Sequence, residues 1–102
     1  MIIVYVPCKD LTEAKSISRY LTKNKLAVCI NIISPIYSIY RWKGKVEQTK
    51  EALMIIKTDD KLVDKVFSSI KKLHSYNTPE IISWKVDKTT DQISNWVKKE
   101  LS

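Results

Sequence analysis

The sequence predicts an α+β fold in which strands and helices follow one another in the order β-α-β-β-α-β-α. Three observations lead to this prediction: runs of β-branched and aromatic residues typical of strands, stretches with helical apolar spacing, and capping residues at the boundaries between them. The length of 102 residues suits one compact domain. We therefore expect a single domain over residues 1–102.

The N-terminal part is expected to hold a strand and a helix. Residues 1–6 are almost all β-branched or aromatic, as in a buried strand. Asp10 begins a helix, with Glu13 in capping-box spacing. The apolar stripe of this helix is formed by Ala14, Ile17 and Leu21. The helix is expected to end at Asn24-Lys25.

A long hairpin is expected next. Residues 27–33 and 36–42 form one strand, interrupted by a bulge or edge kink at Ser34-Pro35 because proline cannot donate to a ladder. Lys43-Gly44 contains the only glycine and is expected to make the turn. Residues 46–57 are expected to form the second strand of the hairpin, which is polar in its first part and apolar at its end. The tip of the hairpin is therefore expected to project beyond the core.

The C-terminal part is expected to hold a helix, a strand and a last helix. Thr58-Asp59-Asp60 caps the first of these helices. Its apolar positions are Val63, Val66, Phe67, Ile70 and Leu73. Residues 74–78 form a loop, and Pro79 begins a new element. The alternation of residues 82–87 predicts a strand with one wet face. Thr90 or Asp91 caps the last helix, whose apolar side holds Ile93, Trp96, Val97 and Leu101.

The first six elements match the split βαβ, ferredoxin-like pattern. Right-handed crossovers then place the strands in the spatial order 4-1-3-2, as an antiparallel sheet with both long helices on one face. The opposite face is left bare and apolar, which usually marks an interface. Together with the projecting hairpin, this predicts an oligomer.

Composition and charge narrow the function classes. The net charge is +7, from 18 Lys and Arg against 11 Asp and Glu. Only Arg19 and Arg41 are arginines, and the lysines are spread along the chain, so we expect a solvated basic surface and no nucleic-acid partner. An RNA-binding domain would need aromatic residues on a central strand, and residues 52–57 have none. No apolar stretch reaches the roughly 20 residues of a membrane span, and residues 1–6 do not resemble a signal peptide. A cytoplasmic protein is expected.

The sequence contains no recognisable catalytic motif. It has no Gly-rich phosphate loop and no HExxH, and a single His leaves little for a Ser-His-Asp set. An acylphosphatase-like enzyme would need an arginine after the first strand, where only Lys9 is present. We therefore expect a binding protein and no enzyme.

Four segments carry a resemblance to a known family. They are LAVCINII at residues 26–33, SIYRWKGK at 38–45, IIKT at 55–58 and HSYNTPEI at 74–81. In this order and spacing they resemble the CutA divalent-ion tolerance proteins. The chain departs from the family at Ser75, where a proline usually follows the histidine, and at Pro7-Cys8-Lys9, where the family often has Thr-x-Pro.

The resemblance implies a fold, an assembly and a role. It implies a ferredoxin-like subunit in a homotrimer joined through the long hairpins, similar in architecture to the PII signalling proteins, and a cytoplasmic location. It implies tolerance of divalent metal ions, copper above all, through binding. The alternative is a PII-like sensor of a small molecule, with an indirect effect on metal tolerance.

The candidate metal ligands are Cys29, His74 and Cys8. The topology places Cys8 and His74 at one end of the subunit and Cys29 at the other, so all three on one ion of one subunit are not expected, whereas a site across a subunit boundary is easier to build. Cys29 as a buried core thiol and His74 as a loop or capping residue are the alternatives. The sequence has no clustered set of four ligands, so structural zinc is not expected. The resemblance implies copper or another divalent ion as the metal bound, and no cofactor is obligatory.

A second set of candidates belongs to an intersubunit cleft, the ligand site that the PII analogy suggests. Tyr40, Trp42 and Trp84 suit either a stacking pocket or packing at a trimer seam. Lys57 and Glu80 end adjacent elements, where they form an ion pair or a polar patch. The full set of cleft candidates is Tyr40, Trp42, Lys57, Tyr76, Glu80 and Trp84.

Overall fold

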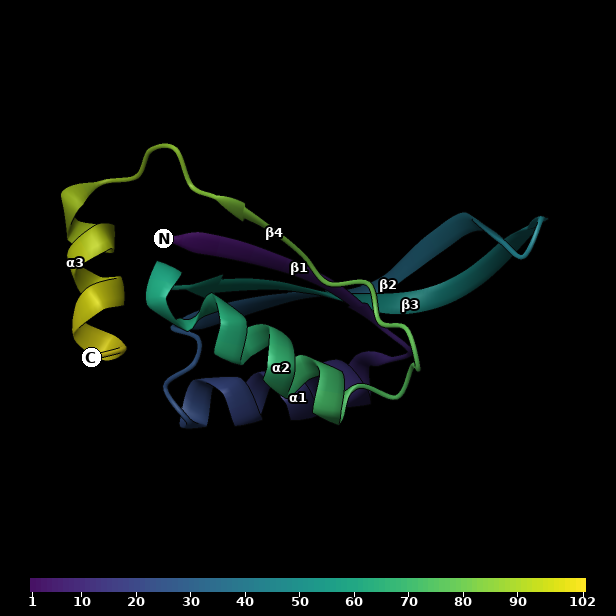
Figure 1. The fold of residues 1–102 in the computed structure, drawn as a ribbon, viewed down its shortest axis with the longest axis horizontal. Helices are drawn as coiled ribbons and strands as arrows, with labels where there is room; N and C mark the ends of the chain where they lie inside the picture. The colour runs from purple at the N-terminus through teal and green to yellow at the C-terminus, as the bar shows by residue number, and fades with distance from the viewer.

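In the computed structural model, which describes residues 1–102, the strands and helices follow the predicted order (Figure 1). The elements are β1 (Ile2–Cys8), α1 (Leu11–Lys23), β2 (Cys29–Trp42), β3 (Lys45–Thr58), the 3₁₀ turn η1 (Asp60–Leu62), α2 (Val63–Leu73), β4 (Ile82–Lys85) and α3 (Asp91–Glu100). The α+β, ferredoxin-like prediction is confirmed.

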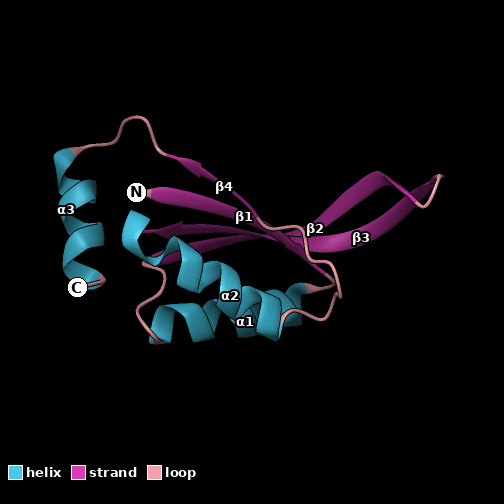
Figure 2. Ribbon diagram, viewed as in Figure 1, coloured by secondary structure: helices cyan, strands magenta, loops and turns pink.

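The sheet is antiparallel with the strand order β2-β3-β1-β4, as predicted. Helices α1 and α2 lie side by side against one face of this sheet (Figure 2). Because β3 lies between β1 and β2, it sets the register of both neighbours. Cys8 at the end of β1 lies opposite Ala52, whereas Cys29 at the start of β2 lies opposite Lys57.

Local signals explain the ends of α1. The Asp10 side chain accepts a hydrogen bond from the backbone N–H of Glu13 at 2.8 Å, which makes Asp10 the N-cap. The Glu13 side chain reaches back to the N–H of Lys9 at 3.1 Å, one residue before the expected partner of a capping box. The helix ends at Lys23, with Asn24 as its C-cap.

The core lies between the sheet and the two helices. Alternate residues of β1 and β3 point toward the helices, and aliphatic side chains of α1 and α2 meet them. The buried cluster consists of Val4, Val6, Cys8, Ala14, Ile17, Leu21, Ala27, Ala52, Met54, Ile56, Val66 and Ile70. Full burial of each large aliphatic side chain contributes about 1.5–3 kcal/mol, so this layer holds the helices in place.

The hairpin changes character half-way along its length. The register between β2 and β3 shifts between Ile33 and Ile36, where the Ser34-Pro35 peptide bond is cis, so the predicted bulge is confirmed. Beyond this point the two strands extend away from the helices, and the molecule reaches 45 Å in its longest dimension (Figure 1). At the tip, Lys43 and Gly44 both have positive φ, as a tight two-residue turn requires.

The face of the sheet opposite the helices is bare. On it Ile33, Ile82 and Trp84 are each about half exposed, at 48%, 47% and 49%. The predicted apolar open face is therefore present. The prediction that β4 has only one wet face is wrong, because all four of its residues are exposed. As an edge strand β4 has a bare sheet face on one side and little helical cover on the other.

The C-terminal segments differ from the sequence-based prediction in two further details. Pro79 does not begin a regular element, and β4 starts only at Ile82. Thr90, not Asp91, caps α3, since its hydroxyl accepts from the N–H of Ile93. Helix α3 lies at the end of the molecule away from the hairpin tip, and only its Val97 is buried (Figure 1). None of the helices has the length and apolar character needed to cross a membrane.

Candidate metal site and neighbouring groove

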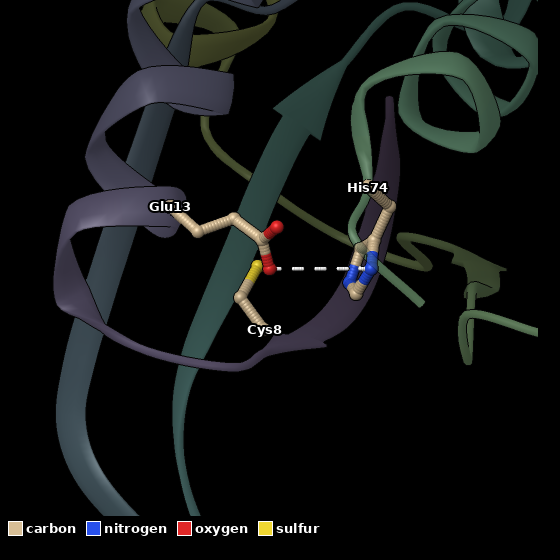
Figure 3. A group of neighbouring side chains, drawn as sticks. All are labelled: Cys8, Glu13 and His74. Atoms are coloured by element: carbon tan, nitrogen blue, oxygen red, sulfur yellow. Dashed lines mark ion pairs between the residues drawn. The ribbon is translucent and has the colours of Figure 1, made fainter. Parts of the chain in front are cut away.

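Three possible metal ligands meet where the end of β1, the first turn of α1 and the end of α2 come together. They are Cys8, Glu13 and His74, and their ligand atoms all lie within 4.8 Å of one another. Figure 3 shows the Cys8 sulfur beside the Glu13 carboxylate, with the His74 ring on the other side of that carboxylate. We call this group the Cys8–Glu13–His74 cluster. The predicted proximity of Cys8 and His74 is thus present in the structure.

The hydrogen bonds of His74 define its tautomer. Nε2 lies 2.8 Å from the carbonyl oxygen of Pro7, and because a carbonyl only accepts, Nε2 carries the proton. Nδ1 accepts a hydrogen bond from the backbone N–H of Tyr76 at 3.1 Å. The ring is therefore neutral, and its lone pair is on Nδ1, 4.0 Å from Glu13 Oε1.

The Cys8 thiol is fully buried. Burial raises the pKa of Cys8 to about 12, and the negative charges of Glu13, Glu51 and Asp10 add to this effect. At neutral pH the sulfur is therefore protonated. A metal ion that binds it has to displace that proton, since the thiolate is the ligand form.

Glu13 is the charged member of the cluster. Burial alone raises its pKa, but the hydrogen bonds from Ser75 and Lys9 outweigh that effect, so the pKa of Glu13 is lowered. Its Oε2 accepts from the N–H of Ser75 at 2.9 Å, which ties α1 to the loop after α2. In the sequence Glu13 was identified only as a capping residue. Glu13 lies in the first turn of α1, directly after the strand that ends at Cys8. The topology that predicts Cys8 near His74 therefore also predicts Glu13 near both.

Cys29 lies far from the cluster. It pairs with Lys57 on β3, whereas Cys8 pairs with Ala52, and five residues of strand span about 17 Å. The ammonium of Lys57 is 3.9 Å from the Cys29 sulfur and donates to the side-chain oxygen of Asn31. One subunit therefore does not bring all three predicted metal ligands together, in agreement with the topology argument.

A groove of about 1150 Å³ lies between the hairpin and residues 76–80. Of the predicted cleft residues, Tyr40, Trp42, Tyr76 and Glu80 line this groove, and Lys57 and Trp84 do not.

The possible ion pair between Lys57 and Glu80 is not formed, because Lys57 lies at the far end of β3 with Asn31 and Cys29 as its partners. Trp84 lies opposite Ile3 on the open face of the sheet.

Tyr76 forms a hydrogen bond with Glu51 of β3, which also lines the groove. The Tyr76 hydroxyl donates to Glu51 Oε2 at 2.8 Å, and Glu51 is 8% exposed. Burial and the adjacent Glu51 raise the pKa of Tyr76, so the hydroxyl stays protonated as the donor. The Tyr76 ring also packs against His74, with 4.8 Å between ring centroids.

The chain resembles known proteins in both sequence and structure. The family model of the CutA1 divalent ion tolerance protein matches residues 2–100. The chain belongs to the CutA family. The divalent-cation tolerance protein CutA of Thermus thermophilus is 30% identical over 97% of this chain and 94% of its own length. The CutA homolog of Xenopus laevis is 40% identical, but this chain spans only 62% of its length, and only 52% of the mouse CutA protein.

Solved CutA structures have the same fold. The structure of CutA from Archaeoglobus fulgidus covers all of this chain with a TM-score of 0.95 at 33% identity. CutA1 from Pyrococcus horikoshii also covers all of it, with a TM-score of 0.94 at 33% identity. At these identities the likeness extends to the family as well as the fold.

Replacement of Glu13 by Gln is expected to destabilise the protein by about 1–3 kcal/mol at pH 7, because charged acceptors make the stronger hydrogen bonds with Ser75 and Lys9. A carboxylate whose pKa is lowered on folding stabilises above its unfolded pKa of about 4.3, and that stabilisation is lost as pH falls through the folded pKa. The difference between wild type and Glu13→Gln in urea unfolding is therefore expected to shrink as the pH falls from about 5 to 3.

The matched control is Glu47→Gln, at an exposed position on the hairpin. It is expected to leave stability unchanged within about 0.5 kcal/mol at both pH values. Equal effects of the two substitutions, or a Glu13→Gln effect that does not depend on pH, would contradict the assigned role of Glu13.

Proposed function

We propose that this protein acts in divalent-ion tolerance by binding the metal ion directly, copper above other metals, and that it works as a binding protein and not as an enzyme. Membership of the CutA family supports the tolerance role. The observation that carries direct binding is the Cys8–Glu13–His74 cluster, which offers sulfur, oxygen and nitrogen ligands within 4.8 Å of one another.

The chemistry of the three ligand atoms suits copper. Thiolate favours Cu(I), imidazole favours Cu(II) and Zn(II), and a set of one S, one N and one O accepts both elements. Three protein ligands leave a coordination position open, unlike the four of a structural zinc site. The hydrogen bond from Nε2–H of His74 to the Pro7 carbonyl is the second contact that commonly orients a metal-binding histidine.

The route to the cluster passes Glu13. The side chain of His74 is fully buried and that of Glu13 is 9% exposed. An incoming cation therefore meets the carboxylate first and then displaces the proton of Cys8. Cys29 has no place in this site within one subunit.

We further propose a homotrimer. The open face, with Ile33, Ile82 and Trp84 half exposed, is an apolar surface of the kind that subunits cover. The hairpin extends beyond the core and is long enough to reach a neighbouring copy (Figure 1). A closed cyclic assembly would cover the same face on every copy.

The proposed compartment is the cytoplasm. A metal site that uses Cys8 needs a reduced thiol, which a reducing compartment maintains. Related proteins do not share one compartment, since the Arabidopsis thaliana protein is named as chloroplastic and the Archaeoglobus fulgidus protein is described as periplasmic.

A second candidate function uses the groove. Its aromatic lining and its two carboxylates, Glu51 and Glu80, favour a small-molecule sensor that affects metal tolerance indirectly. This alternative predicts ligand-dependent thermal stabilisation with no effect of metal ions.

Calorimetric titration of the apo protein with Cu(I) under anaerobic, reducing conditions, and separately with Cu(II), is expected to show saturable binding at one ion per subunit. Replacement of Cys8 by Ser or of His74 by Ala is expected to weaken binding by at least ten-fold, because each removes one of three ligands. Circular dichroism of both variants checks that the fold is retained.

Cys29→Ser is the matched control, since it removes the other thiol far from the cluster. It is expected to leave the affinity unchanged. Weak heats without a defined stoichiometry, the same in all variants, would exclude direct binding and favour the groove-based sensor.

Replacement of Trp84 by Glu is expected to convert the trimer to monomers, because a charge buried in an apolar interface costs several kcal/mol. Light scattering coupled to size exclusion measures the mass. Arg19→Glu, at an exposed position on α1, is the control and is expected to remain trimeric. A monomeric wild type, or a trimeric Trp84→Glu, would contradict the proposed use of the open face.

A further inference from the structure

One residue, Tyr76, contacts the Cys8–Glu13–His74 cluster and also lines the groove. Its backbone N–H donates to Nδ1 of His74 at 3.1 Å. Its hydroxyl donates to Glu51 at 2.8 Å, and both Tyr76 and Glu51 line the groove. The same short segment therefore contacts both places.

The contact with His74 excludes a metal ion. A neutral imidazole has one proton and one in-plane lone pair. Because Nε2 carries the proton and donates it to the carbonyl of Pro7, the one in-plane lone pair of the ring is on Nδ1. That lone pair can bind either the N–H of Tyr76 or a metal ion, but not both.

We propose that Tyr76 couples the metal site to the groove: a metal ion bound by His74 releases Tyr76 from Nδ1 and from Glu51, and the hold of Glu51 on Tyr76 opposes metal binding. This inference rests on the proposed function. It adds to it a way in which the metal-bound state alters a different surface of the same subunit.

The coupling is reciprocal. A ligand shifts a conformational equilibrium only by its differential affinity for the two states, and here the metal-free state alone contains the Tyr76–His74 contact. Whatever strengthens the Tyr76–Glu51 contact therefore weakens metal binding by the same factor. Since Tyr40 of the hairpin lines the same groove and its hydroxyl is close enough to help raise the pKa of Tyr76, the release of Tyr76 reaches the segment proposed to join subunits.

The first test uses Tyr76→Phe and Zn(II) alone, a probe without redox chemistry. The substitution removes the hydroxyl bond to Glu51 and keeps the ring and the backbone N–H. Since one hydrogen bond contributes about 1 kcal/mol, the Kd for Zn(II) is expected to fall about five-fold. Glu51→Gln, which leaves a weaker, neutral acceptor, is expected to shift the Kd in the same direction.

Tyr37→Phe is the control for the first test. Tyr37 lines the same groove, and its hydroxyl makes no hydrogen bond to the protein. Its removal is expected to leave the Kd for Zn(II) unchanged. A Kd for Tyr76→Phe and Glu51→Gln that equals or exceeds that of wild type would overturn the coupling.

The second test reads the groove directly. In NMR spectra of protein with ¹³C-labelled tyrosine rings, the Tyr40 signals, assigned with Tyr40→Phe, report on the groove. Saturating Zn(II) is expected to shift these signals, and Cys8→Ser is expected to move this change to at least ten-fold higher Zn(II).

Saturable Zn(II) binding with unchanged Tyr40 signals would overturn the coupling alone. Absence of saturable binding in wild type would remove the proposed function and the coupling together.

Discussion

The hydrogen bond from Nε2–H of His74 to the carbonyl of Pro7 holds together the part of the molecule on which the proposed metal binding depends. It joins residues 67 positions apart, at the end of α2 and near the end of β1, over 2.8 Å. The Glu13 carboxylate adds a second tie, from α1 to the N–H of Ser75. The first bond is buried and the second is exposed, and together they bring three possible ligand atoms within 4.8 Å of one another without an ion.

The charge state of the metal-free cluster suits a cation. Glu13 is ionised, His74 is neutral, and the buried Cys8 is a thiol. In the proposed site an entering ion would gain the carboxylate and the imidazole lone pair and replace the thiol proton, so binding would release a proton and strengthen as pH rises. The same lone pair accepts the N–H of Tyr76, so the loop after α2 is the segment proposed to respond.

Much of this arrangement could be predicted from the sequence. The strand order, the kink at Ser34-Pro35 and the positive-φ turn at Lys43-Gly44 follow from local patterns and from crossover handedness. The predicted topology also placed Cys8 and His74 at the same end of the subunit, where the structure has them. Glu13 and Glu51 were missed because their roles arise from contacts across 62 and 25 positions, which capping spacing and strand polarity do not encode. The possible ion pair between Lys57 and Glu80 is not formed. The order of the strands shows which of them are neighbours, but it does not show at which end of the sheet each side chain lies.

The proposed metal binding depends on the lone pair of His74 lying on Nδ1, where a metal ion would take the place of the Tyr76 N–H. Since the chain has a single histidine, nitrogen NMR of the ¹⁵N-labelled imidazole tests it without ambiguity. The account predicts a protonated Nε2 in the metal-free protein and, on addition of Zn(II), a large shift of Nδ1 alone while Nε2 keeps its proton. A proton on Nδ1 in the metal-free protein, or an imidazole spectrum that does not respond to Zn(II), would contradict it.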